Sequence, residues 1–218
     1  MKHPLERSVN GPRDPARNLA RTRRRILRAA LAEFSARGMA GARTETIARR
    51  ARVNKRMLFY CFGSKRGLYA EVLRRKIASK AAAIASTPED LGAALKYWAE
   101  IGAGDRDWIR MHEWEALGPS AGPAVALTDR RKLFRSVRAR LRRAQSKGAL
   151  ERGINLEQLF LSVIALSAFP AAFPQIARLV TGMAPTDPRF RRARAKFLDW
   201  LGARMASSGQ GRARGRAR

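Results

Sequence analysis

Residues 44–65 decide the fold of this protein, and they read TETIARRARVNKRMLFYCFGSK. Two short helical patterns, 44–51 and 55–61, flank a four-residue turn at 51–54. Asn54, directly before the second pattern, is a favourable N-cap because its side chain can accept a hydrogen bond from a free backbone N–H. Two short helices joined by such a turn predict a helix-turn-helix.

A helix-turn-helix places particular demands on its residues, and this stretch meets them. The first helix needs a small residue where the second crosses it, and Ala48 stands there. The turn needs one apolar side chain to fill the crossing, and Val53 supplies it. The second helix must present side chains outward that can reach base edges in the major groove of DNA. We expect these side chains to be Lys55, Arg56, Met57, Phe59 and Tyr60.

The charge of the chain points to a polyanionic partner. Lysine and arginine number 46 against 17 acidic residues, which gives a formal net charge of +29. Residues 1–80 hold 22 basic and 5 acidic side chains, whereas residues 81–206 hold 20 and 12. Nucleic acid is the first expectation for such a surface and a membrane surface the second. The amino-terminal third is the expected site of the anion.

Several classes of protein are disfavoured by the sequence. Cys61 is the only cysteine, so neither a disulfide framework nor a thiolate zinc site can form within one chain. We expect Cys61 to be a small buried hydrophobe. The most apolar run, 159–173, is too short to span a bilayer. The sequence has no recognisable catalytic constellation or glycine-rich nucleotide loop. We therefore expect a cytoplasmic protein that is not an enzyme and that needs no membrane, metal or cofactor.

A set of residues in the stretch 21–73 has a distinctive order and spacing: Arg25, Ile26, Leu27, Ala29, Ala30, Phe34, Gly38, Ile47, Ala48, Ala51, Val53, Leu58, Phe62, Gly63, Ser64, Lys65 and Leu68. With these residues the stretch resembles the DNA-binding domain of the tetracycline-repressor (TetR/AcrR) family. The resemblance implies a homodimeric regulator, usually a repressor that a small-molecule effector releases from a double-stranded DNA operator. It also implies that helix 53–61 is the recognition helix and that Lys65 binds a phosphate at a helix start.

The chain departs from the family pattern at three positions. Arg52 stands where the turn usually has glycine, and a left-handed backbone there would cost roughly 1–2 kcal/mol. Ala42 replaces a threonine at the start of the second helix, so a capping hydroxyl is lost unless Thr44 substitutes. Phe59 replaces a tyrosine, and Tyr60 is the candidate to supply its hydroxyl. The full set of residues expected at DNA is Arg43, Thr44, Asn54, Lys55, Arg56, Met57, Phe59, Tyr60 and Lys65.

The helical pattern continues through the rest of the chain and predicts an all-α protein of about nine helices. We expect a disordered basic arm at 1–17, a helix-turn-helix domain at 18–80, a ligand-binding and dimerisation domain at 81–206, and a disordered basic tail at 207–218. The helices are expected at 18–37, 44–51 and 55–61, in a long fourth helix that Ser64 caps, and at 88–102, 105–117, 122–147, 155–180 and 188–206. Pro170 and Pro174 are expected to kink or end helix 155–180.

Two residue groups in the second region have alternative interpretations. An aromatic and methionine group is either ordinary core or the wall of a ligand pocket, and it comprises Tyr97, Trp98, Trp108, Met111, His112, Trp114 and Phe169. The apolar helices 155–180 and 188–206 predict a dimer interface, with an intramolecular core as the alternative. Its residues are Phe160, Ile164, Phe197, Leu198 and Leu201. A basic architectural DNA-binding protein without a ligand is the alternative function.

Overall fold

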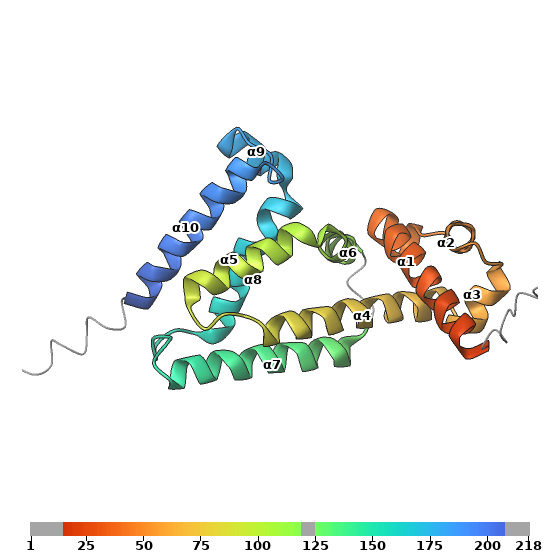
Figure 1. Ribbon diagram of the computed structural model, residues 1–218, viewed down its shortest axis with the longest axis horizontal. Helices are drawn as coiled ribbons and strands as arrows, with labels where there is room; N and C mark the ends of the chain where they lie inside the picture. Colours follow the sequence, from red (N-terminus) through yellow and green to blue (C-terminus); the bar gives the residue numbers. More distant parts are fainter. Residues whose placement is uncertain (1–14, 119–124, 208–218) are drawn as a thin grey trace, which may run out of the picture. The chain divides into compact units, whose positions relative to one another are not determined.

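The computed structural model describes residues 15–118 and 125–207, and within these ranges the chain forms ten α-helices and no strand (Figure 1). This confirms the predicted all-α class. The contacts divide the chain into two compact units, with the boundary between Val72 and Leu73. That boundary lies inside a helix, at an earlier position than the domain limit at residue 80 proposed from the sequence. Most of the two expected disordered ends lies outside the described residues.

The first unit is built from α1 (Pro15–Gly41), α2 (Thr44–Ala51), α3 (Lys55–Phe62) and the start of α4 (Lys65–Ala85). The helix α1 begins at Pro15, earlier than the expected residue 18, because the fixed φ of proline suits the first turn of a helix. Its helical geometry is broken at Gly38, which adopts φ 66° where the sequence predicted the end of the helix. The core side chains come from all four helices: Ile26, Ala30, Phe34, Ile47, Leu58 and Leu68.

The second unit contains six further helices. They are α5 (Leu91–Gly104), α6 (Arg106–Leu117), α7 (Leu127–Ser146), α8 (Leu156–Ala172), α9 (Pro174–Thr181) and α10 (Pro188–Ser207). The helix α5 begins three residues later than expected, because Pro88 does not stand in its first turn and Asp90 provides the N-cap. The carboxylate of Asp90 accepts the Ala93 N–H at 2.7 Å.

The apolar stretch 155–180, which Pro170 and Pro174 were expected to kink or end, forms two helices, α8 and α9, that meet at an angle of 86°. The break lies at Phe173, between Pro170 and Pro174. Proline 174 cannot donate the backbone hydrogen bond that would continue α8, and its ring favours the start of a new helix. The break explains why ten helices are described where about nine were predicted. Among the described residues no single helix has the length and apolar content to cross a bilayer. The bent pair of α8 and α9 has that length and apolar content only when the two helices are counted together.

In the second unit α5 packs against both α8 and α10 (Figure 1). The helices approach closely because glycines stand at the crossings. A Cβ atom on Gly202 of α10 would lie 2.3 Å from Cα of Gly92, and one on Gly102 would lie 2.5 Å from the carbonyl oxygen of Ser167 in α8. No larger residue fits at either crossing without moving backbone, so these two contacts fix the spacing of the three helices.

Candidate functional site

The turn between α2 and α3 has the geometry that the sequence predicted. Arg52 adopts a left-handed conformation with φ 51° and ψ 51°. The N–H of Val53 donates to the carbonyl oxygen of Ala48 at 3.0 Å, and the Asn54 side chain accepts the Met57 N–H at 2.7 Å. Arg52 therefore adopts a strained backbone conformation that glycine would adopt at a lower cost in free energy.

The outer surface of α3 carries polar and aromatic side chains. Tyr60 is 76 % exposed, Phe59 is 36 % exposed, and Lys55 and Arg56 are also exposed. Met57 is half-buried. Lys55 pairs with Glu45 of α2, and this hydrogen bond is the main cause that lowers the pKa of the Glu45 carboxyl. Four of the five expected side chains thus lie in reach of a partner that approaches α3.

The starts of α2 and α4 hold the remaining candidates. Arg43 is exposed, whereas Thr44 is buried and its hydroxyl donates to Glu45 instead of capping α2. Thr44 therefore does not supply the capping hydroxyl that Ala42 lacks. Ser64 accepts the Gly67 N–H at 2.9 Å, so it caps α4 as predicted. The ammonium group of Lys65 donates to the carbonyl oxygen of Ala40 at 3.0 Å.

Two residues that orient the helix-turn-helix were not identified from the sequence. Glu33 of α1 is only 1 % exposed, accepts the Arg43 N–H at 3.3 Å and forms an ion pair with Arg50 of α2 at 3.2 Å. Arg25 donates to the carbonyl oxygens of Ala51 and Arg52, at 2.8 Å for Arg52, and so satisfies the end of α2. The sequence does contain a sign that Glu33 is buried and needs a partner: this acidic residue stands seven positions after Ile26, on the buried face of α1.

Substituting Glu33 by glutamine is expected to destabilise the protein by about 1–2 kcal/mol, because a buried carboxylate loses charged hydrogen bonds that hold α1 to α2. The matched change Glu45→Gln alters a pair in which both side chains are exposed and should have the smaller effect. Urea unfolding followed by circular dichroism measures both. Equal losses would show that the Glu33 contacts do not hold α2 in place.

The aromatic group of the second unit is mostly engaged in internal contacts. Met111 is 1 % exposed, and the hydroxyl of Tyr97 donates to the carbonyl oxygen of Ala83 at 3.1 Å. Most rings of the group contact another ring: Trp98 meets Tyr97 edge-on, Trp108 contacts His112, and Phe169 contacts Phe173. Trp114 lies at the surface and is 40 % exposed.

A cluster of charged groups lies beside these rings in α4, α6 and α7. Asp105 pairs with Lys76 and with Lys80, at 2.9 Å for Lys80. Arg130 of α7 donates to Glu115 at 2.8 Å. Burial removes water from the Asp105 carboxylate, and this alone would raise its pKa. The hydrogen bonds from the two lysines outweigh the effect of burial, so the pKa of Asp105 is lowered. The lysine pair thus fastens the start of α6 to α4.

His112 is the titratable group of this cluster with the clearest consequence for stability. Burial lowers the pKa of His112, with further contributions from the positive charges of Arg130 and Lys80, against the raising effects of the Trp108 carbonyl and Glu115. The unfolded chain then binds this proton more readily than the folded one, so stability falls as the pH drops through the unfolded pKa of about 6.5.

We expect the free energy of unfolding to decrease between pH 7.5 and pH 5.5, by at most about 1.4 kcal/mol per pH unit from this group. The substitution His112→Gln should flatten that dependence, because glutamine does not titrate. Urea titrations of both proteins at the two pH values measure the slopes. If the two slopes coincide, His112 stays accessible to protons in the folded protein.

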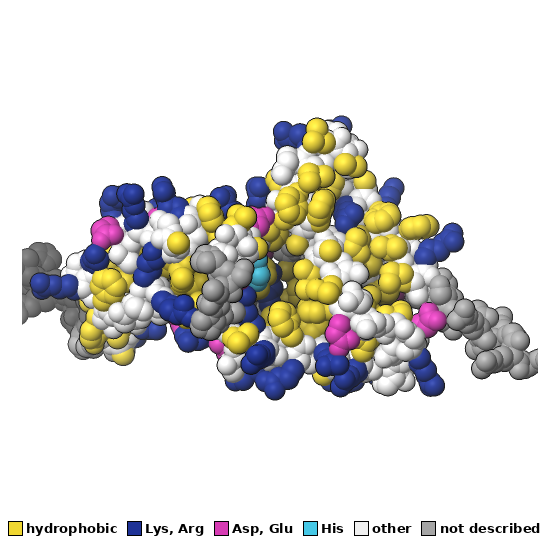
Figure 2. All heavy atoms as spheres, turned by 180° about the vertical axis from the view of Figure 1, so that it is seen from behind, with side chains coloured by type: hydrophobic (Ala, Val, Ile, Leu, Met, Phe, Trp, Pro, Cys, Tyr) yellow, Lys and Arg dark blue, Asp and Glu magenta, His cyan; other side chains and the backbone are white. Residues whose placement is uncertain are grey.

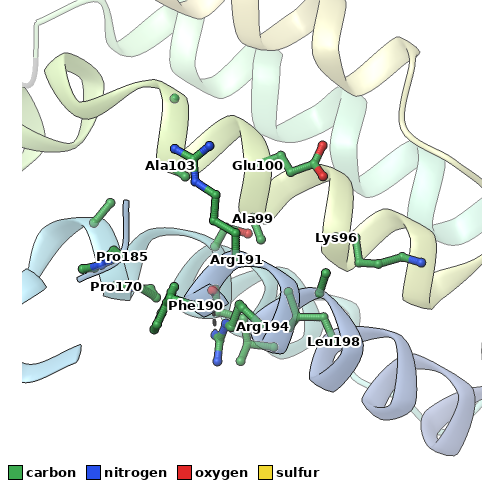
Figure 3. A pocket seen from close by; sticks show the side chains of 15 residues that line it. Lys96, Ala99, Glu100, Ala103, Pro170, Pro185, Phe190, Arg191, Arg194 and Leu198 are labelled. Atoms are coloured by element: carbon green, nitrogen blue, oxygen red, sulfur yellow. Dashed lines mark hydrogen bonds between the residues drawn. The ribbon is translucent and has the colours of Figure 1, made fainter. Parts of the chain in front are cut away.

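A hollow with a volume of about 320 Å³ lies between α5, α8 and α10 (Figure 3). None of the seven residues expected at a ligand pocket lines it. Its walls come instead from small and apolar residues together with four charged ones: Lys96, Ala99, Glu100, Ala103, Gly104, Leu166, Ser167, Pro170, Ala171, Pro185, Phe190, Arg191, Arg194, Ala195 and Leu198.

Hydrophobic side chains gather on one face of the second unit (Figure 2). On α8, Leu161 and Ile164 are 57 % and 42 % exposed, and on α10, Phe197 and Trp200 are 44 % and 55 % exposed. We call these four residues the α8–α10 face. Of the other residues expected at a dimer interface, Phe160 and Leu201 are half-buried, while Leu198 is fully buried in its own chain and has no surface to offer a partner.

Comparisons with known proteins agree with this architecture. Residues 26–72 match the family described as bacterial regulatory proteins, tetR family. The HTH-type transcriptional repressor SCO4008 of Streptomyces coelicolor is 28 % identical over 167 residues, which cover 77 % of this chain and 87 % of that protein. The HTH-type transcriptional repressor NicS of Pseudomonas putida is 45 % identical over 64 residues, which cover 29 % of this chain and 30 % of that protein.

Solved structures extend the likeness beyond the helix-turn-helix. The putative transcriptional regulator SCO4942 from Streptomyces coelicolor superposes with a TM-score of 0.68 at 28 % identity, over 83 % of this chain and 97 % of that one. Salmonella enterica GusR shares the fold, with a TM-score of 0.64 at 19 % identity over 91 % of this chain and 100 % of that one. With the motif of residues 44–65, these findings show that residues 26–72 form a helix-turn-helix domain of the tetR family of bacterial regulatory proteins, and they support a DNA-binding transcriptional regulator.

Proposed function

We propose that this protein is a homodimeric repressor that binds two half-sites of an operator and leaves it when a small molecule binds. The observation that carries the proposal is the exposed polar surface of α3 on a helix-turn-helix in which Asn54 caps α3 and Ser64 caps α4. The names of SCO4008 and NicS as transcriptional repressors support the direction of regulation.

In the proposed complex α3 enters the major groove. Arg56 donates to base edges, because a planar guanidinium suits bidentate contact with guanine. Lys65 contacts a phosphate with the N–H groups that its bond to Ala40 leaves over, at a helix start where the dipole also favours an anion. Tyr60 supplies the hydroxyl that Phe59 lacks. These contacts combine sequence recognition with positioning on the backbone.

The proposed dimer forms through the α8–α10 face. One short helix reads too few base pairs for a specific site, whereas a two-fold dimer reads two half-sites at a fixed spacing. Two chains that each carry a net charge of +29 repel one another, so the interface must be apolar and bury more than about 1,000 Å² in total. The exposed leucine, isoleucine, phenylalanine and tryptophan of this face meet the first requirement.

The proposed ligand response uses α4, which supplies Lys65 to the first unit and Lys76 and Lys80 to the second. A ligand that displaces helices of the second unit would shift α4 and change the distance between the two recognition helices of the dimer. The helices then no longer match successive major grooves about 34–36 Å apart.

Selection of bound fragments from random DNA, followed by footprinting, tests the proposal. We expect an inverted repeat whose half-site centres are separated by one helical turn, about 10–10.5 base pairs, or a multiple of it. Footprints without a common sequence would favour the alternative of a basic architectural protein, whose affinity depends steeply on salt and little on sequence.

A further inference from the structure

The hollow between α5, α8 and α10 has a fixed shape. The contact of Gly92 with Gly202 sets the distance from α5 to α10, and the contact of Gly102 with Ser167 sets the distance from α5 to α8. Because backbone meets backbone at both crossings, the helices cannot close the space by moving together. A preformed concave space of this kind is the usual setting for a small-molecule site.

The apolar part of the hollow comes from all three helices. Phe190 and Leu198 of α10 are buried. Leu166 and Pro170 of α8 line the same space as Ala99 and Ala103 of α5, as Figure 3 shows for Pro170 and the two alanines. If each non-hydrogen atom of a ligand takes about the 30 Å³ of one water molecule, 320 Å³ holds roughly ten such atoms. The hollow therefore suits a small ligand with an apolar body.

Arg194 brings a half-buried positive charge to this wall. Its Nη2 atom donates to the carbonyl oxygen of Leu166 at 2.9 Å. In a regular helix that carbonyl would accept the N–H of residue 170, which is a proline and has none. The Nε atom of Arg194 is buried and has no hydrogen-bond partner within the described residues. Burial also lowers the pKa of Arg194, in keeping with a guanidinium that has lost water.

A second arginine, Arg191, lines the same space and has no counter-ion among the described residues. Arg191 reaches from α10 toward Ala103 of α5 (Figure 3) and forms no ion pair among the described residues. Lys96 is already paired with Asp199 at 2.8 Å. Glu100 is the single carboxylate of the lining and pairs with neither arginine in the described part of the chain. Neither guanidinium group thus has a carboxylate partner in the described part of the chain.

We infer that this hollow binds a small monocarboxylate with an apolar body of about ten non-hydrogen atoms. The carboxylate accepts hydrogen bonds from Nε of Arg194 and from Arg191, and the body packs on Phe190, Leu166 and Pro170. A planar guanidinium fork matches a carboxylate in shape and charge. A buried donor without an acceptor is unfavourable, so the ligand satisfies a group that the chain alone leaves unsatisfied.

Calorimetric titration of the full chain with benzoate and octanoate, and with benzamide and octanamide as neutral matches, tests the inference. We expect one saturable site per chain and at least tenfold tighter binding of one carboxylate than of its amide. Arg191→Gln should abolish this preference without loss of fold, because Arg191 is exposed. Arg192→Gln, which removes the same charge from an exposed arginine outside the hollow, should leave the preference unchanged.

Three results would overturn the site. They are the absence of saturable binding by either carboxylate, equal affinity for acid and amide, and equal effects of the two arginine substitutions. Inorganic phosphate that binds as tightly as the carboxylates would show a bare anion site instead. The effect on DNA rests on the proposed function and is measured separately: benzoate that binds without weakening operator affinity keeps the site and removes the proposed release.

Discussion

Replacing Leu161 and Trp200 with glutamate is expected to convert the protein into a folded monomer whose affinity for operator DNA falls at least 100-fold. Both side chains lie more than half exposed on the α8–α10 face, so the chain's own core does not depend on them. Glutamates there would place charges in the apolar centre of the proposed interface, where they cannot stay hydrated. A monomer reads one half-site and loses the second set of contacts.

The charge change needs its own control, because two added carboxylates weaken DNA binding by themselves. Ser79→Glu with Ala82→Glu adds the same charge at exposed positions of α4 and should leave the dimer intact. Sedimentation equilibrium gives the oligomeric state, and titration with operator DNA gives the affinity. A dimer that survives the Leu161 and Trp200 changes would move the interface elsewhere. A wild-type monomer at micromolar concentration would remove the dimer from the proposal.

Replacing Arg56 with alanine is expected to relax sequence preference at one position of each half-site. The loss of a bidentate contact to a base costs roughly 1–3 kcal/mol, which corresponds to about 5- to 150-fold in affinity for that base pair. Arg56 is exposed at the start of α3, so its removal should leave the fold unchanged. Selection from a randomised operator compares the preferred sequences of the variant and the wild type.

The substitution Lys65→Ala is the matched control for Arg56, because it removes a proposed phosphate contact. It should weaken binding to all sequences alike and lower the salt dependence by about one unit of slope. Part of its effect on stability will come from the lost bond to Ala40. An unchanged preferred sequence in the Arg56 variant would count against α3 as the reading helix.

The local structure of the first unit could be predicted because short-range rules determine it. Asn54 and Ser64 are N-caps in the structure as in the prediction, and Arg52 takes the left-handed conformation expected of its position. The contacts of Glu33 and Arg25 were missed because each joins α1 to a helix or turn at least ten residues away. Such pairs are decided by how helices pack and not by local propensity.

The second unit was harder to predict for the same reason. The aromatic side chains from Tyr97 to Trp114 suggested a pocket wall, yet Met111 is core and Tyr97 is bonded to Ala83. The hollow lies instead where glycines bring α5 to α8 and α10, and a glycine in a helical pattern gives no sign of what it will touch. The break in the apolar stretch 155–180 was predicted from Pro170 and Pro174 and is confirmed, because proline acts locally. Leu198 could not be assigned to core or interface from periodicity alone.

The most direct test of the account is the ratio between the affinity for a selected operator and the affinity for a scrambled sequence of equal length. It should be measured at physiological salt, because the positive charge of this chain raises all affinities at low salt. We expect a ratio of at least about 1,000. Affinities that agree within a few-fold, and that fall together as salt rises, would contradict it and identify a protein that binds DNA by charge alone.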